Sequence, residues 1–156
     1  MIERQLGRPA RALAGVAARC PFGAPAVVRQ ADYLESGEPF PTTFYMTCPA
    51  AVARLGELED AGGVERYQRL LGTDPEAAAS YAWGVRRQRE LRRPAASMLD
   101  GGRSLTLGIG GTERDGAVKC LHAHAAFALA EPRYLFGGRM LAEVEPLFPL
   151  ERCCCG

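Results

Sequence analysis

Several features that would place this protein in a familiar class are scarce or absent from its 156 residues. No apolar run is long enough to cross a bilayer, and segment 1–11 carries charges where a secretory signal has an apolar core. The formal net charge is only +1, which argues against a strongly electrostatic partner such as duplex DNA. We therefore expect a cytoplasmic protein with no membrane segment. Its expected partner is a small molecule or a protein rather than a nucleic acid.

The six cysteines include no Cys-x-x-Cys pair. Such pairs supply two ligands locally in zinc ribbons and ferredoxin loops, so the fold itself has to assemble any metal site in this protein. In a reducing cytoplasm, cysteines serve as ligands, nucleophiles or buried apolar side chains more often than as a disulfide framework.

Lysine is nearly absent as well. All but one of the 19 basic residues are arginine, and the exception is Lys119. Together with abundant Ala, Gly and Pro, this bias is typical of a GC-rich genome. A titratable ammonium and a guanidinium are not interchangeable. We therefore consider Lys119, which lies beside Cys120 and close to His122, a candidate catalytic residue together with that histidine.

Strand and helix signals alternate irregularly along the chain, with no internal repeat. The patterns predict strands over 13–18, 26–29, 42–48 and 104–109, and helices over 49–61, 64–71, 75–92, 117–130 and 138–147. The clearest helix start is Asp74-Pro75-Glu76, because Asp is a good cap and Pro suits the first helical position.

This irregular order predicts an α+β fold rather than a repeating βαβ fold. We expect one domain over residues 1–150, in which a small mixed or antiparallel sheet packs against about four or five helices. Residues 151–156, which contain Cys153, Cys154 and Cys155, are expected to form a disordered tail outside the site.

Three cysteines fall at predicted element boundaries. Cys20 follows a strand, Cys48 lies between a strand and a helix, and Cys120 lies in the first turn of a helix. Sites are often built at such boundaries, and a helix N-terminus also favours the thiolate over the thiol. Cys20 and Cys48 each precede a proline, as cysteines in ferredoxin-type clusters can. We predict that the three cysteines are metal ligands.

A histidine or an exogenous group is expected in the fourth ligand position. His124 follows Cys120 by four residues and shares its helical face, whereas His122 is displaced by about 200°. His124 is the geometric partner if the helix is regular at Cys120, and His122 is the partner if Cys120 lies in the cap. Thiolate-rich sites select an iron-sulfur cluster or zinc. The two cysteine-proline steps favour the cluster.

A glycine-rich turn precedes the cysteine-histidine segment. Backbone amides at Gly110 and Gly111 could cradle a phosphate or carboxylate, although such a turn commonly has no binding role. Arg19, next to Cys20, completes the set of predicted cofactor-binding residues.

Five short motifs give the chain a resemblance to a known family. They are Gln5-Leu6-Gly7-Arg8, Arg19-Cys20-Pro21-Phe22-Gly23, Gly37-Glu38-Pro39-Phe40-Pro41-Thr42, Tyr45-Met46-Thr47-Cys48-Pro49 and Lys119-Cys120-Leu121-His122-Ala123-His124. The chain resembles the family catalogued as domain of unknown function 501 (DUF501).

The resemblance implies a cytoplasmic bacterial protein whose pattern includes the three cysteines, Lys119 and His122. It supplies no activity, although genes of such proteins are often found near division-septum and exopolyphosphatase genes. Many members have a further histidine where this chain has Phe127.

Our leading hypothesis is a metal-binding protein with Cys20, Cys48 and Cys120 as thiolate ligands. An open iron in a three-cysteine cluster could act as a Lewis acid, whereas a closed zinc site would be structural. One alternative is a metal-free enzyme in which Cys120 is a nucleophile activated by histidine and Lys119. The other is a non-catalytic adaptor linked to cell division.

Overall fold

A three-stranded antiparallel sheet lies beside a group of helices in the computed structural model, which describes residues 1–155. In chain order the elements are α1 (Ile2–Leu6), β1 (Leu13–Arg19), β2 (Pro25–Gln30), β3 (Phe44–Met46), α2 (Pro49–Asp60), α3 (Gly63–Thr73), α4 (Pro75–Leu91), the 3-10 helix η1 (Arg103–Thr106), α5 (Leu121–Ala130) and α6 (Leu135–Glu143). The predicted α+β class is confirmed.

The sheet has the order β1-β2-β3, so β2 is its central strand. The first two predicted strands are present and pair as a hairpin, whose turn is closed by the Cys20 N–H, which donates to the Ala24 carbonyl. β2 is almost completely buried, whereas β1 is an exposed edge strand with register irregularities. β3 is shorter than the predicted strand 42–48, but the Gln30 N–H still pairs with the Thr43 carbonyl.

Helix starts follow the local signals in the sequence. α2 begins at Pro49 after the N-cap residue Cys48, as predicted. At α4, Asp74 Oδ1 accepts the backbone N–H groups of Glu76 and Ala77 at 2.9 and 3.1 Å. This confirms the predicted cap, which satisfies two of the donors that a helix N-terminus leaves unpaired.

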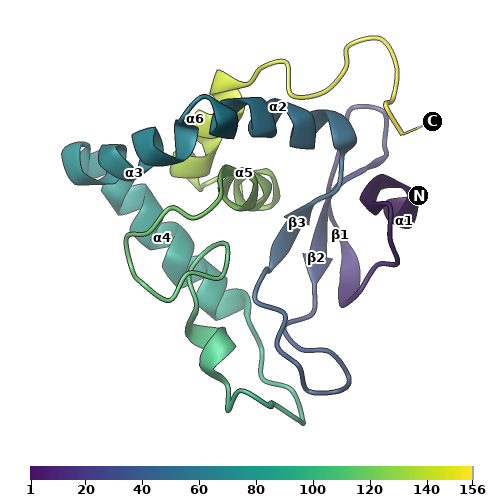
Figure 1. The fold of residues 1–156 in the computed structure, drawn as a ribbon, viewed down its shortest axis with the longest axis vertical. Helices are drawn as coiled ribbons and strands as arrows, with labels where there is room; N and C mark the ends of the chain where they lie inside the picture. The colour runs from purple at the N-terminus through teal and green to yellow at the C-terminus, as the bar shows by residue number, and fades with distance from the viewer. Residues whose placement is uncertain (156) are drawn as a thin grey trace.

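α5 is the centre of the domain. Figure 1 shows it end-on, with the sheet on one side and α3 and α4 on the other, whereas α1 lies on the far side of the sheet. It is apolar around most of its circumference, as expected for a helix covered on all sides. The adjacent α6 packs tightly, because a Cβ at Gly137 would collide with the His124 carbonyl of α5. On α4, the only tryptophan, Trp83, stacks on Tyr134 with ring centroids 6.5 Å apart.

The predicted strand 104–109 is wrong. This stretch forms η1 and a turn, and its backbone groups find partners other than a neighbouring strand. Asp100 accepts the N–H of Ser104 at 2.7 Å, and the Gln88 side chain of α4 donates to the carbonyls of Leu107 and Gly108. With these groups paired, the segment gains nothing from joining the sheet.

Two predicted helix boundaries are also wrong. α5 begins at Leu121 rather than 117, because the Val118 N–H donates to the Gln68 side chain and the Ala117 carbonyl accepts from the Tyr81 hydroxyl. α6 covers Leu135–Glu143 rather than 138–147.

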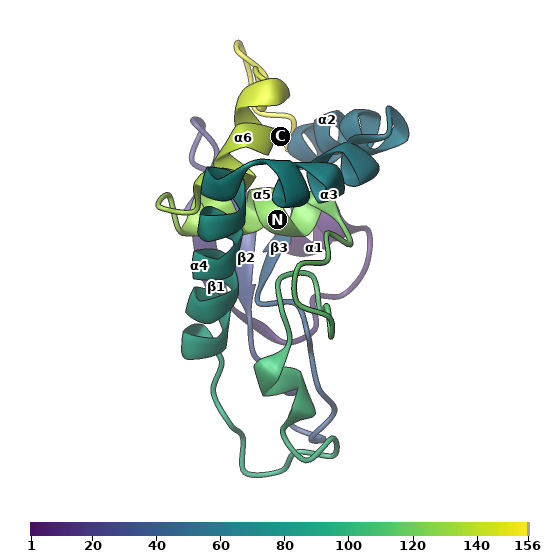
Figure 2. The same ribbon diagram turned by 90° about the vertical axis from the view of Figure 1, so that its left-hand side faces the viewer.

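Two long connections extend away from the helices, as Figure 2 shows. They are the β2–β3 loop and the segment between α4 and α5, and they bind one another. The Tyr33 hydroxyl donates to Asp100 at 2.9 Å, and the Leu99 N–H donates to the Gly37 carbonyl at 2.9 Å.

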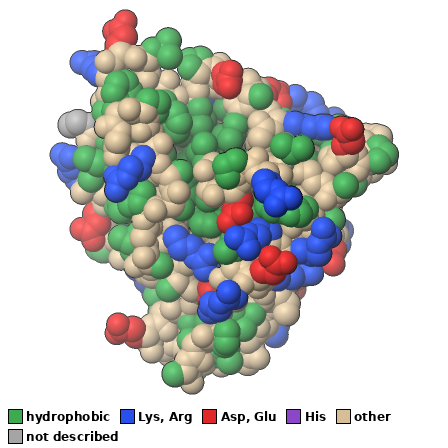
Figure 3. Space-filling view, turned by 180° about the vertical axis from the view of Figure 1, so that it is seen from behind, with side chains coloured by type: hydrophobic (Ala, Val, Ile, Leu, Met, Phe, Trp, Pro, Cys, Tyr) green, Lys and Arg blue, Asp and Glu red, His purple; other side chains and the backbone are tan. Residues whose placement is uncertain are grey.

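The far side of the molecule carries two kinds of surface. Figure 3 shows hydrophobic side chains in a hollow on the upper part of this face and Lys and Arg side chains across the lower half. Within residues 1–155, none of the helices combines the length and the apolar content that crossing a bilayer requires.

Candidate functional site

Cys120 lies at the N-terminus of α5, where it is the N-cap residue. Its backbone is extended (φ −157°, ψ 126°), so the first helical residue is Leu121. Helix α2 supplies the acceptor that a cap side chain would normally provide, since Glu59 Oε1 accepts the Leu121 N–H at 2.6 Å. The positive end of the helix dipole also stabilises a carboxylate in this position.

The His122 side chain turns back towards Cys120 and Glu59. Its Nδ1 lies 3.8 Å from Cys120 Sγ and 3.1 Å from Glu59 Oε1, and its Nε2 lies 3.0 Å from the Val52 carbonyl oxygen. A carbonyl oxygen can only accept, so Nε2 carries the hydrogen. Cys120, Glu59 and His122 thus bring three ligand atoms within 4.8 Å of one another.

The electrostatics of this group follow from its contacts. The hydrogen bond to Cys120 and those to Val52 and Glu59 raise the pKa of His122 to about 9, against the opposing effect of burial. Burial acts to raise the pKa of Glu59, but the Leu121 N–H and His122 outweigh it and the pKa lies below its usual value. In the absence of a metal, the two side chains form an ion pair beside the thiol.

A pocket of about 340 Å³ adjoins the group. Its walls come from β3, from Val52 of α2 and from the start of α5. Its polar or flexible lining includes Lys119, Cys120, His122 and Gly110. The structure therefore places both predicted catalytic residues, Lys119 and His122, at one pocket.

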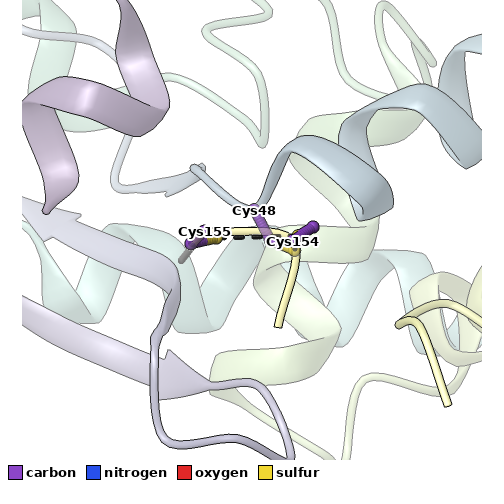
Figure 4. Close-up of side chains that lie close together, drawn as sticks. All are labelled: Cys48, Cys154 and Cys155. Carbon is purple, nitrogen blue, oxygen red and sulfur yellow. Dashed lines mark hydrogen bonds between the residues drawn. The ribbon is translucent and has the colours of Figure 1, made fainter. Parts of the chain in front are cut away.

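A second group contains Cys48 with two cysteines of the C-terminal segment. The Cys48 and Cys154 sulfurs are 3.5 Å apart, and those of Cys154 and Cys155 are 3.6 Å apart (Figure 4). Cys48 is buried at the N-cap of α2, whereas Cys154 is exposed. The sequence placed residues 151–156 outside the site, yet Cys154 and Cys155 lie against a predicted ligand. Residue 156 lies outside the described part of the chain.

The predicted set of Cys20, Cys48 and Cys120 is not brought together. Among the described residues, Cys48 and Cys120 belong to two different groups and Cys20 to neither. Cys20 is buried in the β1–β2 turn, where Arg19 Nη1 donates to the Gly23 carbonyl at 2.7 Å. Arg19 therefore closes the turn. Of the two glycines, Gly110 lines the pocket, whereas Gly111 faces Pro41.

His124 points into the core rather than towards Cys120. Its side chain is fully buried, and its Nδ1 lies 2.6 Å from the Tyr134 hydroxyl. Burial lowers its pKa to about 3, so the ring is neutral. Because Cys120 is in the cap, the helical spacing that favoured His124 does not apply. The alternative that paired Cys120 with His122 matches the geometry.

Glu59 is the member of the group that sequence reasoning missed. It lies four residues after Leu55 and seven after Val52, so the three residues share one face of the predicted helix 49–61. An acid at that spacing on an otherwise apolar stripe was the signal that could have identified it.

The fold is that of a small α+β protein. A cysteine, a histidine and a carboxylate converge at the N-terminus of its central helix. The chain belongs to the family described as "Protein of unknown function (DUF501)", whose family model matches residues 16–142. No curated protein and no solved structure matches the chain.

Proposed function

We propose that this protein binds one zinc ion through Glu59, Cys120 and His122 and presents it to a small molecule in the adjoining pocket. The observation that carries the proposal is the convergence of three different ligand atoms beside that pocket. Catalytic zinc sites have three protein ligands and an open fourth position, whereas structural sites are closed by four. A three-ligand group at a pocket of about 340 Å³ fits the first kind.

The spacing of the donor atoms supports a tetrahedral ion. Zinc–ligand distances of about 2.0 to 2.3 Å place neighbouring ligands roughly 3.4 to 3.6 Å apart. The observed separations are 3.8 Å from sulfur to Nδ1 and 3.1 Å from Nδ1 to the carboxylate oxygen. Small side-chain rotations bring both into the expected range.

The orientation of His122 adds a second argument. A ligating histidine usually donates its other N–H to a carbonyl or carboxylate, and His122 Nε2 faces the Val52 carbonyl in that way. In a nucleophile-histidine-acid triad, the nucleophile and the acid contact different ring nitrogens. Here Cys120 and Glu59 face the same nitrogen. This favours a metal ligand over a relay.

Zinc replaces the iron-sulfur cluster as the favoured metal because clusters require several thiolates and this group has one. When bound, the ion would polarise a carbonyl or phosphoryl oxygen or lower the pKa of a bound water. Lys119, which lines the same pocket, would contribute a positive charge for an anionic ligand. A reducing cytoplasm fits this proposal because Cys120 can bind zinc only while its sulfur stays reduced.

Zinc titration of matched variants tests the proposal. All chains carry Cys154→Ser and Cys155→Ser, so that the second thiol group does not contribute. We expect the parent chain to bind one zinc ion. Cys120→Ser and Glu59→Gln should each lower the zinc affinity by more than the 10- to 100-fold that the loss of an outer-shell contact typically costs. Cys20→Ala, which removes another cysteine at an element boundary, is the control and should bind zinc with the affinity of the parent chain.

A cobalt spectrum identifies the ligands directly. Co²⁺ at a thiolate site gives a sulfur-to-metal charge-transfer band, which should appear with the parent chain and vanish with Cys120→Ser. Equal zinc affinity in the parent and Cys120→Ser would rule the proposal out.

A cysteine nucleophile is the second candidate, and one observation favours it. His122 Nδ1 lies 3.8 Å from Cys120 Sγ, the arrangement of a nucleophile beside a general base. This candidate predicts rapid alkylation of Cys120 in metal-free protein, no stoichiometric zinc, and slower alkylation in His122→Asn.

A further inference from the structure

The second thiol group has no part in the proposed zinc site. Its three sulfurs, from Cys48, Cys154 and Cys155, all lie within 4.8 Å of one another. The C-terminal segment brings two of them to the start of α2, more than a hundred residues away in sequence from Cys48 (Figure 4). We propose that these residues form a three-thiolate site for a monovalent soft metal ion, Cu(I).

The geometry is close to that of an occupied site. Sulfurs that share one ion at a metal–sulfur distance of about 2.3 Å lie roughly 3.8 to 4.0 Å apart. The measured separations are 3.5 Å for Cys48–Cys154 and 3.6 Å for Cys154–Cys155. An ion therefore fits after the sulfurs move apart by a few tenths of an ångström.

Contacts from the N-terminal helix position the C-terminal segment. Gln5 Nε2 donates to Cys155 Sγ at 2.9 Å, and Arg4 Nη2 donates to the Cys155 carbonyl at 3.3 Å. The Cys155 N–H in turn donates to Cys153 Sγ at 3.4 Å. These bonds hold Cys155 beside Cys48, so the ligands do not depend on random encounters of a free tail.

The start of α2 stabilises negative sulfur. The Ala51 and Ala50 N–H groups face the sulfur of Cys48, and the Ala50 N–H also faces that of Cys154. A helix N-terminus is a favourable place for thiolates and for the negative charge of a metal–thiolate unit.

The donor set selects the ion. Only sulfur donors are present in this group, and soft thiolates favour Cu(I), zinc or iron-sulfur clusters. Structural zinc almost always takes four ligands, and the remaining thiol of the C-terminal segment, Cys153 Sγ, accepts the Cys155 N–H and is not part of the group. Three thiolates without a nitrogen or oxygen donor suit a single Cu(I).

Anaerobic competition with a chromophoric Cu(I) chelator tests the site in the full chain. All chains carry Cys120→Ser, which removes the zinc group and makes the two proposals independent. We expect one Cu(I) per chain and an affinity at least ~100-fold weaker in Cys154→Ser, a loss above the usual range for outer-shell changes. Cys154 is exposed, so this substitution should leave the fold intact. Cys153→Ser is the control and should keep the parent affinity.

Alkylation and mass spectrometry of the loaded protein count the ligands. Cu(I) should protect Cys48, Cys154 and Cys155 and leave Cys153 reactive. Protection of only two of the three, parent-like affinity in Cys154→Ser, or failure of the parent chain to compete with the chelator would each overturn the proposal. A Cys48–Cys154 disulfide in protein handled without oxygen would overturn it too.

Discussion

At the scale of single residues, the two histidines have opposite environments. His122 is held among acceptors and a thiol, so its charged form is favoured. His124, two residues later, lies in an aromatic pocket with Tyr81, Tyr134 and Phe136, and burial keeps it neutral. Two histidines within one helical turn therefore lie in different places, His122 at the pocket and His124 in the core.

The Tyr134 hydroxyl is the only group near His124 Nδ1 that can donate to it among the described residues. Tyr134→Phe would leave that nitrogen buried without a partner, which typically costs about 1–3 kcal/mol. Urea denaturation should show the loss as a lower midpoint. Tyr45→Phe, on the exposed side of β3, is the control and should change the free energy of unfolding by less than about 0.5 kcal/mol. Equal stability of the two variants would mean that the buried bond contributes nothing.

At the scale of elements, the close backbone approach between α5 and α6 constrains residue size at their contact. A Cβ at Gly137 would collide with the His124 carbonyl, whereas a Cβ at Gly138 would meet nothing within 4 Å. Gly137→Ala should therefore force the helices apart and cost about 1–3 kcal/mol. Gly138→Ala should be neutral or stabilise by up to about 1 kcal/mol, because alanine is the better helix former. Thermal unfolding of the two variants provides the test, and similar Tm values for Gly137→Ala and Gly138→Ala would contradict the close packing.

Asp100 organises the segment between α4 and α5. Burial acts to raise its pKa, but the N–H groups of Ser104 and Gly102 and the Tyr33 hydroxyl outweigh it and lower the pKa to about 2. A folded-state pKa below the ordinary value of about 3.9 means that this carboxylate stabilises the fold above that pH. The contribution is lost as the pH falls towards 2.

Asp100→Asn should therefore flatten the loss of stability between pH 4 and pH 2. Denaturation midpoints measured across that interval provide the test. Glu35→Gln is the control, because Glu35 is exposed and forms no ion pair or hydrogen bond with any residue in 1–155. A pH profile of Asp100→Asn that is parallel to that of the parent would refute the assignment.

Local signals in the sequence predict elements well where the backbone bonds within its own segment. Asp74 caps α4, Pro49 begins α2, and the first two strands lie within a residue of their predicted ranges. Prediction failed where a distant side chain takes the backbone bonds. Gln88 does this after η1, and Gln68 does it before α5.

The same reason explains the candidate site. The sequence identified Cys120, His122 and Lys119 because they are neighbours, but not Glu59, which reaches them from another helix. It also grouped three boundary cysteines that the fold separates, since residue spacing carries no information on which boundaries meet.

At the scale of the whole molecule, Glu59 of α2 meets Cys120 and His122 at the start of α5, so the proposed zinc ion would join the two helices and couple metal binding to folding. An ion that binds only the native state stabilises it, by roughly 2.7 kcal/mol when free ligand is 100 times Kd. Zinc should raise the Tm of the chain carrying Cys154→Ser and Cys155→Ser, and a chelator should reverse the change. In the same chain with His122→Asn, the zinc-dependent rise should be absent. An equal rise in both would place the ion elsewhere.

The stacking of Trp83 on Tyr134 gives this protein a built-in optical probe. No second indole contributes to the emission, so selective excitation reports on the contact between α4 and Tyr134, one ring of the aromatic pocket around His124. Loosening of that pocket should shift the wavelength and intensity of the Trp83 fluorescence. Every variant described above can therefore be screened for an intact interior without attaching a dye.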